Sequence, residues 1–187
     1  MKTYFERKSS DYSGASHIGP FKYIRSFETN CNKRVLDQVP RGRAIDIGSG
    51  AGHYYKVLRD LGFSDVVCLD SSPGMLSACK KEGFWSYLAD IEKQEVSLPP
   101  FDLVFSAGLL EFTQSPQCVI AKLCRLCLDK GHIILFTSRN FVLSLPYFYF
   151  HKRRGNKILL FSNKFLVDEF VRNGFSCMYQ KNVLPFG

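Results

Sequence analysis

The chain has 187 residues, of which 45% are hydrophobic and 22% are charged, and its formal net charge is +8. This composition is typical of one folded domain and argues against a disordered chain. No apolar run approaches the ~20 residues that a membrane-spanning helix needs, and the positive charge leaves nucleic acids, acidic substrates and anionic membranes open as partners.

The first segment of the chain, residues 4–19, is rich in serine, glycine and charge and contains the aromatic residue Tyr12. We interpret this segment as a lid-like arm. Pro20 opens a predicted helix that reaches about Asp37, because apolar residues recur there near helical spacing. A proline and a glycine at 40–42 end that helix.

Short strands and helices are then predicted to alternate. The strands are at 43–47, 65–69, 84–88, 102–106 and 132–137, and the helices are at 51–61, 73–81 and 117–128. Such alternation predicts an α/β fold with a doubly wound, mostly parallel sheet that has helices on both faces.

The pattern changes after Asn140. Residues 141–150 are strongly apolar and aromatic, and a basic cluster of Lys152, Arg153, Arg154 and Lys157 follows them. Core packing and a solvated loop are one interpretation of the segment 141–157, and contact with an acceptor or a membrane surface is the other. Beyond a short apolar run at 158–161, Ser162 is predicted to cap a helix that reaches residues 173–174, and 175–183 is a predicted last strand.

The seven cysteines are an odd number and show no disulfide framework. The first eight residues lack the apolar stretch of a secretory signal, so we expect a cytoplasmic protein. Cys118, Cys124 and Cys127 fall within the predicted helix 117–128. We interpret Cys124 and Cys127 as small buried hydrophobes and expect no metal site.

The most informative motif is the run 44–52, in which Asp46 precedes Gly48, Gly50 and Gly52. Glycines allow a sharp turn and close approach of a ligand, and the following helix points free N–H groups at that ligand. Dinucleotide sites use the spacing G-x-G-x-x-G to seat a pyrophosphate, whereas the spacing here is G-x-G-x-G. A carboxylate before the turn opposes a diphosphate and suits a positively charged cofactor, which points to S-adenosylmethionine.

Three later strand ends add candidate contacts. Asp70 ends the second strand, where a carboxylate can accept both ribose hydroxyls, and a turn or helix-cap role is its alternative. Asp90 follows the third strand and is a candidate acceptor for the adenine amine, with Met75 and Ile91 packing the ring. The backbone after Ser106 is expected under the methionine part of the cofactor.

In this order the motifs resemble the class I S-adenosylmethionine-dependent methyltransferases, in particular the small-molecule branch that includes the ubiquinone-biosynthesis enzymes. The resemblance extends from about Tyr4 to Gly174. It rests on residues 46–52, 70–76, 89–90, 101–104 and 123–132. It implies a Rossmann-like methyltransferase fold and an aromatic N-terminal arm that closes over the cofactor, here with Tyr4, Phe5 and Tyr12.

The resemblance implies a single methyltransferase domain over 1–187, with an arm and helix at 1–40, a cofactor-binding core at 41–138 and an acceptor-side segment at 139–187. The cofactor is S-adenosylmethionine. The candidate cofactor-binding residues are Tyr12, Asp46, Gly48, Ser49, Gly50, Gly52, Asp70, Ser71, Met75, Ala89, Asp90, Ile91, Ser106 and Ala107.

The chain also departs from the family pattern. It keeps Glu111 but has Gly108 and Phe112 where the ubiquinone branch has a further acid and a histidine, so no catalytic residue is assigned. The Asn-Pro-Pro-aromatic motif of base methylation is absent, which disfavours a nucleic-acid partner. The last strand of the family's C-terminal hairpin is expected to be missing, rearranged or beyond the end of the chain.

The expected function is methyl transfer from S-adenosylmethionine to a small, apolar or aromatic acceptor. A non-catalytic methyltransferase-like protein acting through a partner, and an RNA methyltransferase, are the alternatives, and homo-oligomerisation is left open. A base is needed only if the acceptor must lose a proton. We interpret His53 and His132 as structural, and His17 and His151 as surface residues that could reach an acceptor.

Overall fold

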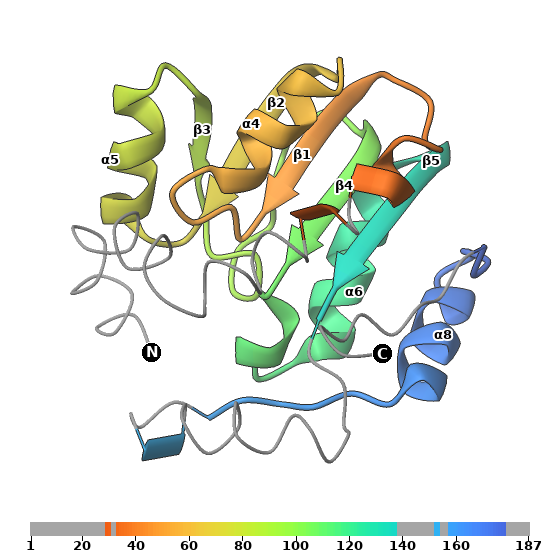
Figure 1. Ribbon diagram of the computed structural model, residues 1–187. Coiled ribbons are helices and arrows are strands. Elements are labelled where there is room, and N and C mark those ends of the chain that lie inside the picture. The colour runs from red at the N-terminus through yellow and green to blue at the C-terminus, as the bar shows by residue number, and fades with distance from the viewer. Residues whose placement is uncertain (1–28, 31–32, 138–151, 154–156, 179–187) are drawn as a thin grey trace.

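The computed structural model of the protein describes residues 29–30, 33–137, 152–153 and 157–178, which form a sheet flanked by helices (Figure 1). In chain order its elements are β1 (Arg43–Ile47), α4 (His53–Asp60), β2 (Ser64–Asp70), α5 (Pro73–Lys81), β3 (Trp85–Leu88), β4 (Phe101–Ala107), η1 (Leu110–Phe112), α6 (Pro116–Arg125), β5 (Cys127–Phe136) and α8 (Asn163–Arg172).

The five strands form one sheet in the order β3-β2-β1-β4-β5, and every neighbouring pair is parallel. The chain builds outward from β1 to β3 and then crosses to the other side of β1 with β4 and β5. The strand order therefore reverses between β1 and β4. In open parallel sheets, ligands bind outside the carboxyl ends of the strands at such a reversal.

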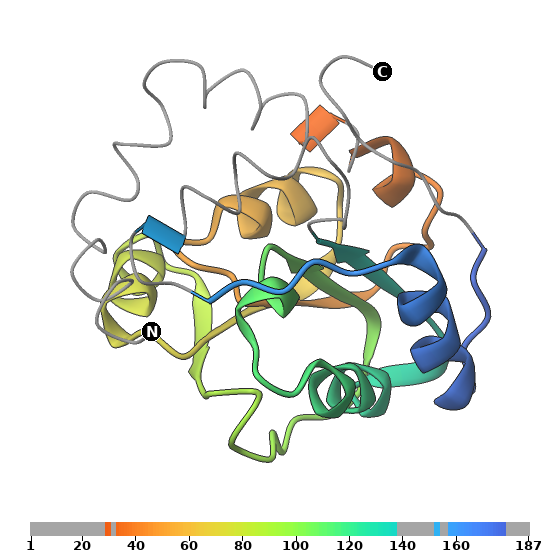
Figure 2. The same ribbon diagram turned by 90° about the horizontal axis from the view of Figure 1, so that it is seen from below.

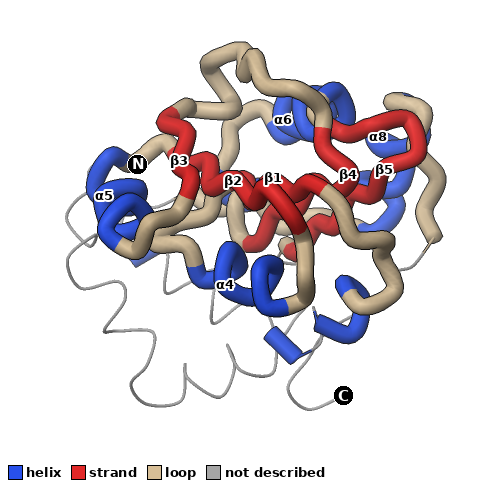
Figure 3. Tube along the Cα trace, turned by 90° about the horizontal axis from the view of Figure 1, so that it is seen from above, coloured by secondary structure: helices blue, strands red, loops and turns tan. Residues whose placement is uncertain are grey.

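Helices cover both faces of the sheet, as the alternation predicts. Seen along the sheet, α4 and α5 lie on one side of the strands and α6 and α8 on the other (Figure 3). Figure 2 shows α6 and α8 side by side on their face, where they contact each other. The doubly wound parallel fold is thus confirmed.

The central strand β1 shows why the sheet is buried from both sides. Ile45 and Ile47 pack into the cluster that contains the α6 side chains, whereas Ala44 packs into the cluster of α4. All three side chains are fully buried. Successive side chains of a strand point to opposite faces, so a strand between two helical layers has to be apolar on both.

Local capping explains where α5 and α8 begin. The hydroxyl oxygen of Ser72 accepts a hydrogen bond from the Met75 N–H at 3.4 Å, and Pro73 occupies the first turn of α5. The Ser162 hydroxyl accepts from the Phe165 N–H at 3.2 Å. The cap predicted at Ser162 is therefore confirmed.

The prediction was wrong around Cys127, which begins β5 instead of lying in a helix. Helix α6 ends at Arg125, and β5 starts five residues before the predicted 132. Phe101 pairs with Cys127, but Leu103 pairs with His132, so residues 128–131 form an irregular insertion in the strand. Apolar residues on either side of this insertion mimic the spacing of a continuing helix.

Several predictions fall wholly or partly outside the described residues. Of the helix predicted over 20–37, residues 29–30 and 33–36 are described and are helical. Of the strand predicted at 175–183, residues 175–178 are described and form no strand. The arm at 4–19, with Tyr12 and His17, and residues 141–151 lie outside the described part. None of the helices among the described residues has the length and apolar character of a membrane-spanning segment.

Candidate functional site

The glycine turn joins β1 to α4 and is held to the end of β2. The N–H groups of Gly48 and Ser49 both donate to the Leu69 carbonyl oxygen, at 2.8 and 3.1 Å. Gly48, Gly50 and Gly52 have φ values of 75°, 55° and 81°, which favour glycine. A Cβ added at Gly52 would lie 2.8 Å from the Phe84 ring, but one added at Gly50 would meet nothing within 4 Å. Gly52 is therefore required by packing, and Gly50 leaves its backbone open to approach.

Asp46 lies under this turn and is almost completely buried, with 1% of its surface exposed. Its Oδ2 atom and the Ser49 hydroxyl oxygen are buried and have no hydrogen-bond partner among the described residues. Burial raises the pKa of the Asp46 carboxyl well above its usual range, and the nearby Asp70 and Cys79 raise it further. Buried polar atoms without partners are rare in folded proteins, so the unpaired Asp46 Oδ2 atom and Ser49 hydroxyl need an explanation.

Asp70 ends β2 and connects two turns. Its Oδ2 accepts a hydrogen bond from the Gly50 N–H at 2.9 Å, and its Oδ1 accepts from the Ser72 N–H at 2.8 Å. Burial raises the pKa of Asp70, although hydrogen bonds from Ser72, Gly50 and Ser71 act in the opposite direction. Each carboxylate oxygen has a second lone pair, so the bonds within the protein leave acceptor capacity for a ligand.

The two acids give this corner of the sheet a negative character within a basic protein. None of the ion pairs of the described residues includes Asp46 or Asp70. A cationic ligand at the corner would lower the cost of charging both carboxyl groups, whereas a phosphate would raise it.

The segment after β3 lies next to this corner. The Ala89 N–H donates to the Asp70 carbonyl oxygen at 3.1 Å, and Ala89, Ile91 and Met75 are all buried. The Asp90 carboxylate accepts from the Glu92 N–H at 3.2 Å and lies 3.3 Å from the Lys93 ammonium. The structure thus joins Ala89 to Asp70 directly and holds Asp90 by local bonds.

Ser106 is used by the sheet itself. Its buried hydroxyl donates to the Ile47 carbonyl oxygen at 2.9 Å, which ties β4 to β1. Ala107 ends β4 and is half-buried, and Gly108 has a φ of 70°. At this strand end the backbone around Ala107 and Gly108 remains as the candidate contact, because the Ser106 hydroxyl is already bonded.

Glu111 lies in η1, immediately beyond the end of β4, and is buried with 3% exposed. The Thr137 hydroxyl donates to its carboxylate at 2.9 Å, and the Leu159 N–H donates to its backbone carbonyl oxygen at 2.7 Å. Glu111 therefore joins the ends of β4 and β5 to the segment that leads into α8. Its buried carboxylate has a structural partner at the edge where the strands end.

The structure places two of the four histidines. His53 is the first residue of α4, and its Nε2 lies 3.0 Å from the Thr29 hydroxyl oxygen. His132 lies inside β5, where its Cα is paired with that of Leu103, and not at the start of the strand. His151, like His17, lies outside the described residues.

The cysteines near α6 do not share a helix. Cys124 is in α6 and Cys127 is in β5, and burial raises their pKa values to about 12 and about 11 respectively. In the part of the chain that the structure describes, His, Cys, Asp and Glu side chains form no group of three that could hold a metal ion.

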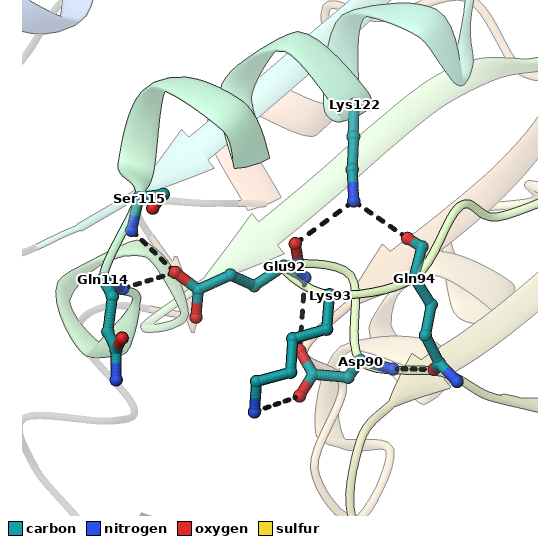
Figure 4. Close-up of polar contacts among 7 residues, drawn as sticks. All are labelled: Asp90, Glu92, Lys93, Gln94, Gln114, Ser115 and Lys122. Carbon is teal, nitrogen blue, oxygen red and sulfur yellow. Dashed lines mark hydrogen bonds and ion pairs between the residues drawn. The ribbon is translucent and has the colours of Figure 1, made fainter.

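Two features of the site were missed by sequence reasoning. The Cys79 thiol donates to the Gly50 carbonyl oxygen at 3.4 Å, so a side chain of α5 contacts the backbone of the glycine turn. Its spacing of four from the buried Met75 was an available signal. Lys122 and Glu92 bind the segment after β3 to α6 (Figure 4). No sequence signal connects these two residues, because the contact depends on the tertiary fold.

Comparison with known proteins agrees with this geometry. A family described as a methyltransferase domain matches residues 45–135. A malonyl-[acyl-carrier protein] O-methyltransferase from Anoxybacillus flavithermus is 28% identical over 110 residues, which cover 56% of this chain and 41% of the relative. The matched part is thus less than half of that relative's length.

Solved structures share the fold at low sequence identity. A chain of a complex that contains a methyltransferase activator of Haloferax volcanii has a TM-score of 0.79 and 16% identity, over 96% of this chain and 79% of that one. Magnesium protoporphyrin IX methyltransferase from Synechocystis, solved with bound SAH, has a TM-score of 0.73 and 16% identity, over 94% and 88% of the two chains. At such identities the likeness shows the fold.

Proposed function

We propose that the chain is a class I S-adenosylmethionine-dependent methyltransferase that methylates a small, apolar or aromatic acceptor, and the methyltransferase-domain family that matches residues 45–135 supports this proposal. The observation that carries the proposal is a pair of acids beside the glycine turn, the buried Asp46 and the half-buried Asp70, neither of which takes part in an ion pair of the described residues. S-adenosylmethionine supplies a methyl group on a positively charged sulfur, which a nucleophile held in line can displace.

The chain's own residues divide the task of holding this cofactor. The backbone of Gly48–Gly52 allows close approach, because Gly50 has open space where a side chain would be. Asp70 accepts the ribose hydroxyls with the lone pairs that the turn leaves unused, and Asp46 supplies negative charge. Ser49 and Ser71 contribute polar groups next to these acids.

The remaining candidate contacts surround this centre. Ala89, Asp90, Ile91 and Met75 enclose the adenine, with Asp90 as the acceptor for its amine. The backbone at Ser106 and Ala107 lies toward the methionine part. The proposal also includes Tyr12, which is supported by the sequence resemblance alone.

A dinucleotide is the rival ligand for a glycine turn of this kind. Its pyrophosphate would bring two negative charges to a corner where burial already raises the pKa values of Asp46 and Asp70. Like charges at short range oppose each other strongly in a buried site. The electrostatics therefore favour a cationic cofactor.

The acceptor is inferred from the chain itself, because the relatives named above methylate acceptors as different as a malonyl-acyl carrier protein and a magnesium porphyrin. The aromatic residues in 141–150 suit an apolar or aromatic acceptor. The basic residues at 152–154 and 157 suit contact with an anionic membrane surface. A single domain over 1–187, a cytoplasmic location and the expectation that nucleic acid is not a partner stay predictions, and homo-oligomerisation stays open.

Calorimetric titration with S-adenosylhomocysteine tests cofactor binding, with NAD as the diphosphate-bearing control. We expect binding of the first ligand and no measurable heat with the second. Preference for NAD, or binding of neither ligand, would contradict the proposal.

Transfer of labelled methyl groups from S-adenosylmethionine to a panel of aromatic and lipid-like acceptors tests catalysis. We expect at least one of these acceptors to be labelled. Cofactor binding without transfer to any acceptor would favour a non-catalytic protein that acts through a partner. Labelling of RNA, together with salt-sensitive RNA binding, would favour the nucleic-acid alternative.

A further inference from the structure

Helix α6 carries a buried lysine. Lys122 is 6% exposed, and lysine is almost never buried unless its charge is paired. Its ammonium donates to the backbone carbonyl oxygens of Glu92 and Gln94, at 3.2 and 3.0 Å, and lies 3.6 Å from the Glu95 carboxylate. The ammonium thus makes two hydrogen bonds, drawn in Figure 4, and one ion pair, and all three partners lie in the segment between β3 and β4.

A second contact joins the same segment to the beginning of α6. The Glu92 side chain accepts hydrogen bonds from the N–H groups of Gln114 and Ser115, both at 2.6 Å. These N–H groups lie just before the helix, where backbone donors lack partners within the helix and negative charge is favourable. Glu92 and Lys122 therefore attach one irregular segment to both ends of the same helix.

The attached segment is the turn 90–94, which holds Asp90. The N–H groups of Lys93 and Gln94 donate to the Asp90 carbonyl oxygen at 3.0 and 2.8 Å, and the Asp90 N–H donates to the Gln94 side chain at 2.7 Å. The turn contains no helix or strand of its own. Its shape therefore depends on these local bonds and on the contacts with α6.

We propose that Lys122 and Glu92 are positioning residues that fix Asp90 for recognition of the adenine amino group. The inference rests on the proposed function and deepens it. A binding site that accepts a hydrogen bond from an amine discriminates strongly against an analogue without the amine only if the acceptor is held rigidly. An apolar side chain would fill the place of Lys122 with a smaller desolvation cost, but it could not bond the Glu92 and Gln94 carbonyl groups.

The test compares two ligands: S-adenosylhomocysteine and S-inosylhomocysteine, which has an oxygen in place of the 6-amino group. We expect the unmodified protein to prefer the first by roughly tenfold or more, as one well-placed hydrogen bond provides. Lys122→Met should reduce that preference by several-fold, mainly through weaker binding of the adenosyl ligand. Lys122→Arg, which keeps the donors, should retain most of the preference.

Arg125→Met is the matched control, since Arg125 is an exposed cation of the same helix whose ion pair and hydrogen bond among the described residues are both with Glu95. It should leave the ratio of the two affinities unchanged. In the background of Asp90→Ala, Lys122→Met should have no further effect on the ratio, because the residue through which it acts is gone. A purely structural lysine would weaken both ligands equally in either background, and that result would overturn the proposal.

Glu92→Ala provides an independent variant if Lys122→Met fails to fold, and it should reduce the same preference. An unchanged ratio in Glu92→Ala would overturn the proposal even though the cofactor binds. If the unmodified protein binds neither ligand, the proposed function fails first and the role of Lys122 fails with it. The two failures are thus distinguished by the unmodified protein.

Discussion

Two buried charged groups on opposite sides of the central strands illustrate different uses of charge. Lys122 is 6% exposed, and its ammonium makes two hydrogen bonds to backbone carbonyl groups and an ion pair with Glu95. Asp46 is 1% exposed, and one of its oxygens has no partner among the described residues. The lysine is bonded within the protein, whereas the fold buries the aspartate where its charged form is disfavoured.

The difference indicates where a ligand belongs. A buried charge whose hydrogen bonds are complete contributes to a defined structure, because its partners would otherwise be unpaired. A buried charge with an unpaired atom costs stability in the free protein, and a bound cation can recover that cost. The ligand is therefore expected beside the glycine turn, near Asp46. The contacts of Lys122 on α6 support the neighbouring turn after β3.

The largest effect on stability is expected from Lys122→Met. The variant leaves two backbone carbonyl groups without their donor, so the free energy of unfolding should fall by about 2–3 kcal/mol. Urea unfolding followed by circular dichroism measures this change. A loss below ~0.5 kcal/mol would show that the buried lysine contributes little to the fold.

Asp70→Ala should act mainly on the ligand. Removal of a charge-assisted acceptor should weaken S-adenosylhomocysteine binding by at least ~1 kcal/mol. The stability of the free protein should change less, because Gly50 and Ser72 lie in turns at the sheet edge where water can replace the bond. Calorimetry and urea unfolding on the same preparation separate the two effects, and unchanged affinity would count against the ribose assignment.

Asp46→Asn should have the opposite effect on the free protein. It removes an acid whose burial disfavours the charged form, so the free energy of unfolding at pH 7 should rise by about 1 kcal/mol, while affinity for the cationic S-adenosylmethionine should fall. Asp129→Asn, at an exposed position of β5, is the matched control and should change neither quantity. If Asp46→Asn destabilised the protein instead, Asp46 would have a stabilising partner that the described contacts lack.

The same variant makes a prediction about pH. The pKa of Asp46 is raised well above 3.8 in the folded protein, so the folded state keeps this proton where the unfolded state has lost it. The contribution of Asp46 to stability therefore falls as the pH rises from about 3.8 through the folded pKa, and is constant above it. The stability gain of Asp46→Asn should be smallest at acidic pH and grow with pH, as urea unfolding at several pH values can show.

The smallest effect is expected from Glu95→Gln. Glu95 is 74% exposed and contacts both Lys122 and Arg125. Exposed ion pairs contribute little, so the free energy of unfolding should change by less than ~0.5 kcal/mol. A loss comparable with that of Lys122→Met would show that the ion pair, and not the two carbonyl groups, stabilises the lysine.

Much of the core could be predicted from the sequence because its signals are local. Three glycines at alternating positions identify the turn, and their positive φ values agree with that requirement. Ser162 and Pro73 mark helix starts through interactions within one turn of chain. The prediction was wrong at Cys127, because the insertion at 128–131 is defined only by pairing with β4. The role of each candidate site residue remains a proposal.

The sequence by itself determined the alternation of strands and helices and the position of the glycine turn, since both depend on residues close together in the chain. Only the tertiary structure decided that the Gly50 N–H bonds to Asp70, that Asp46 is left with an unpaired oxygen, and that Lys122 bonds to the turn after β3. Those contacts join residues that are far apart in the chain. They arise because the order of the parallel strands brings particular strand ends and helix ends to the same edge of the sheet.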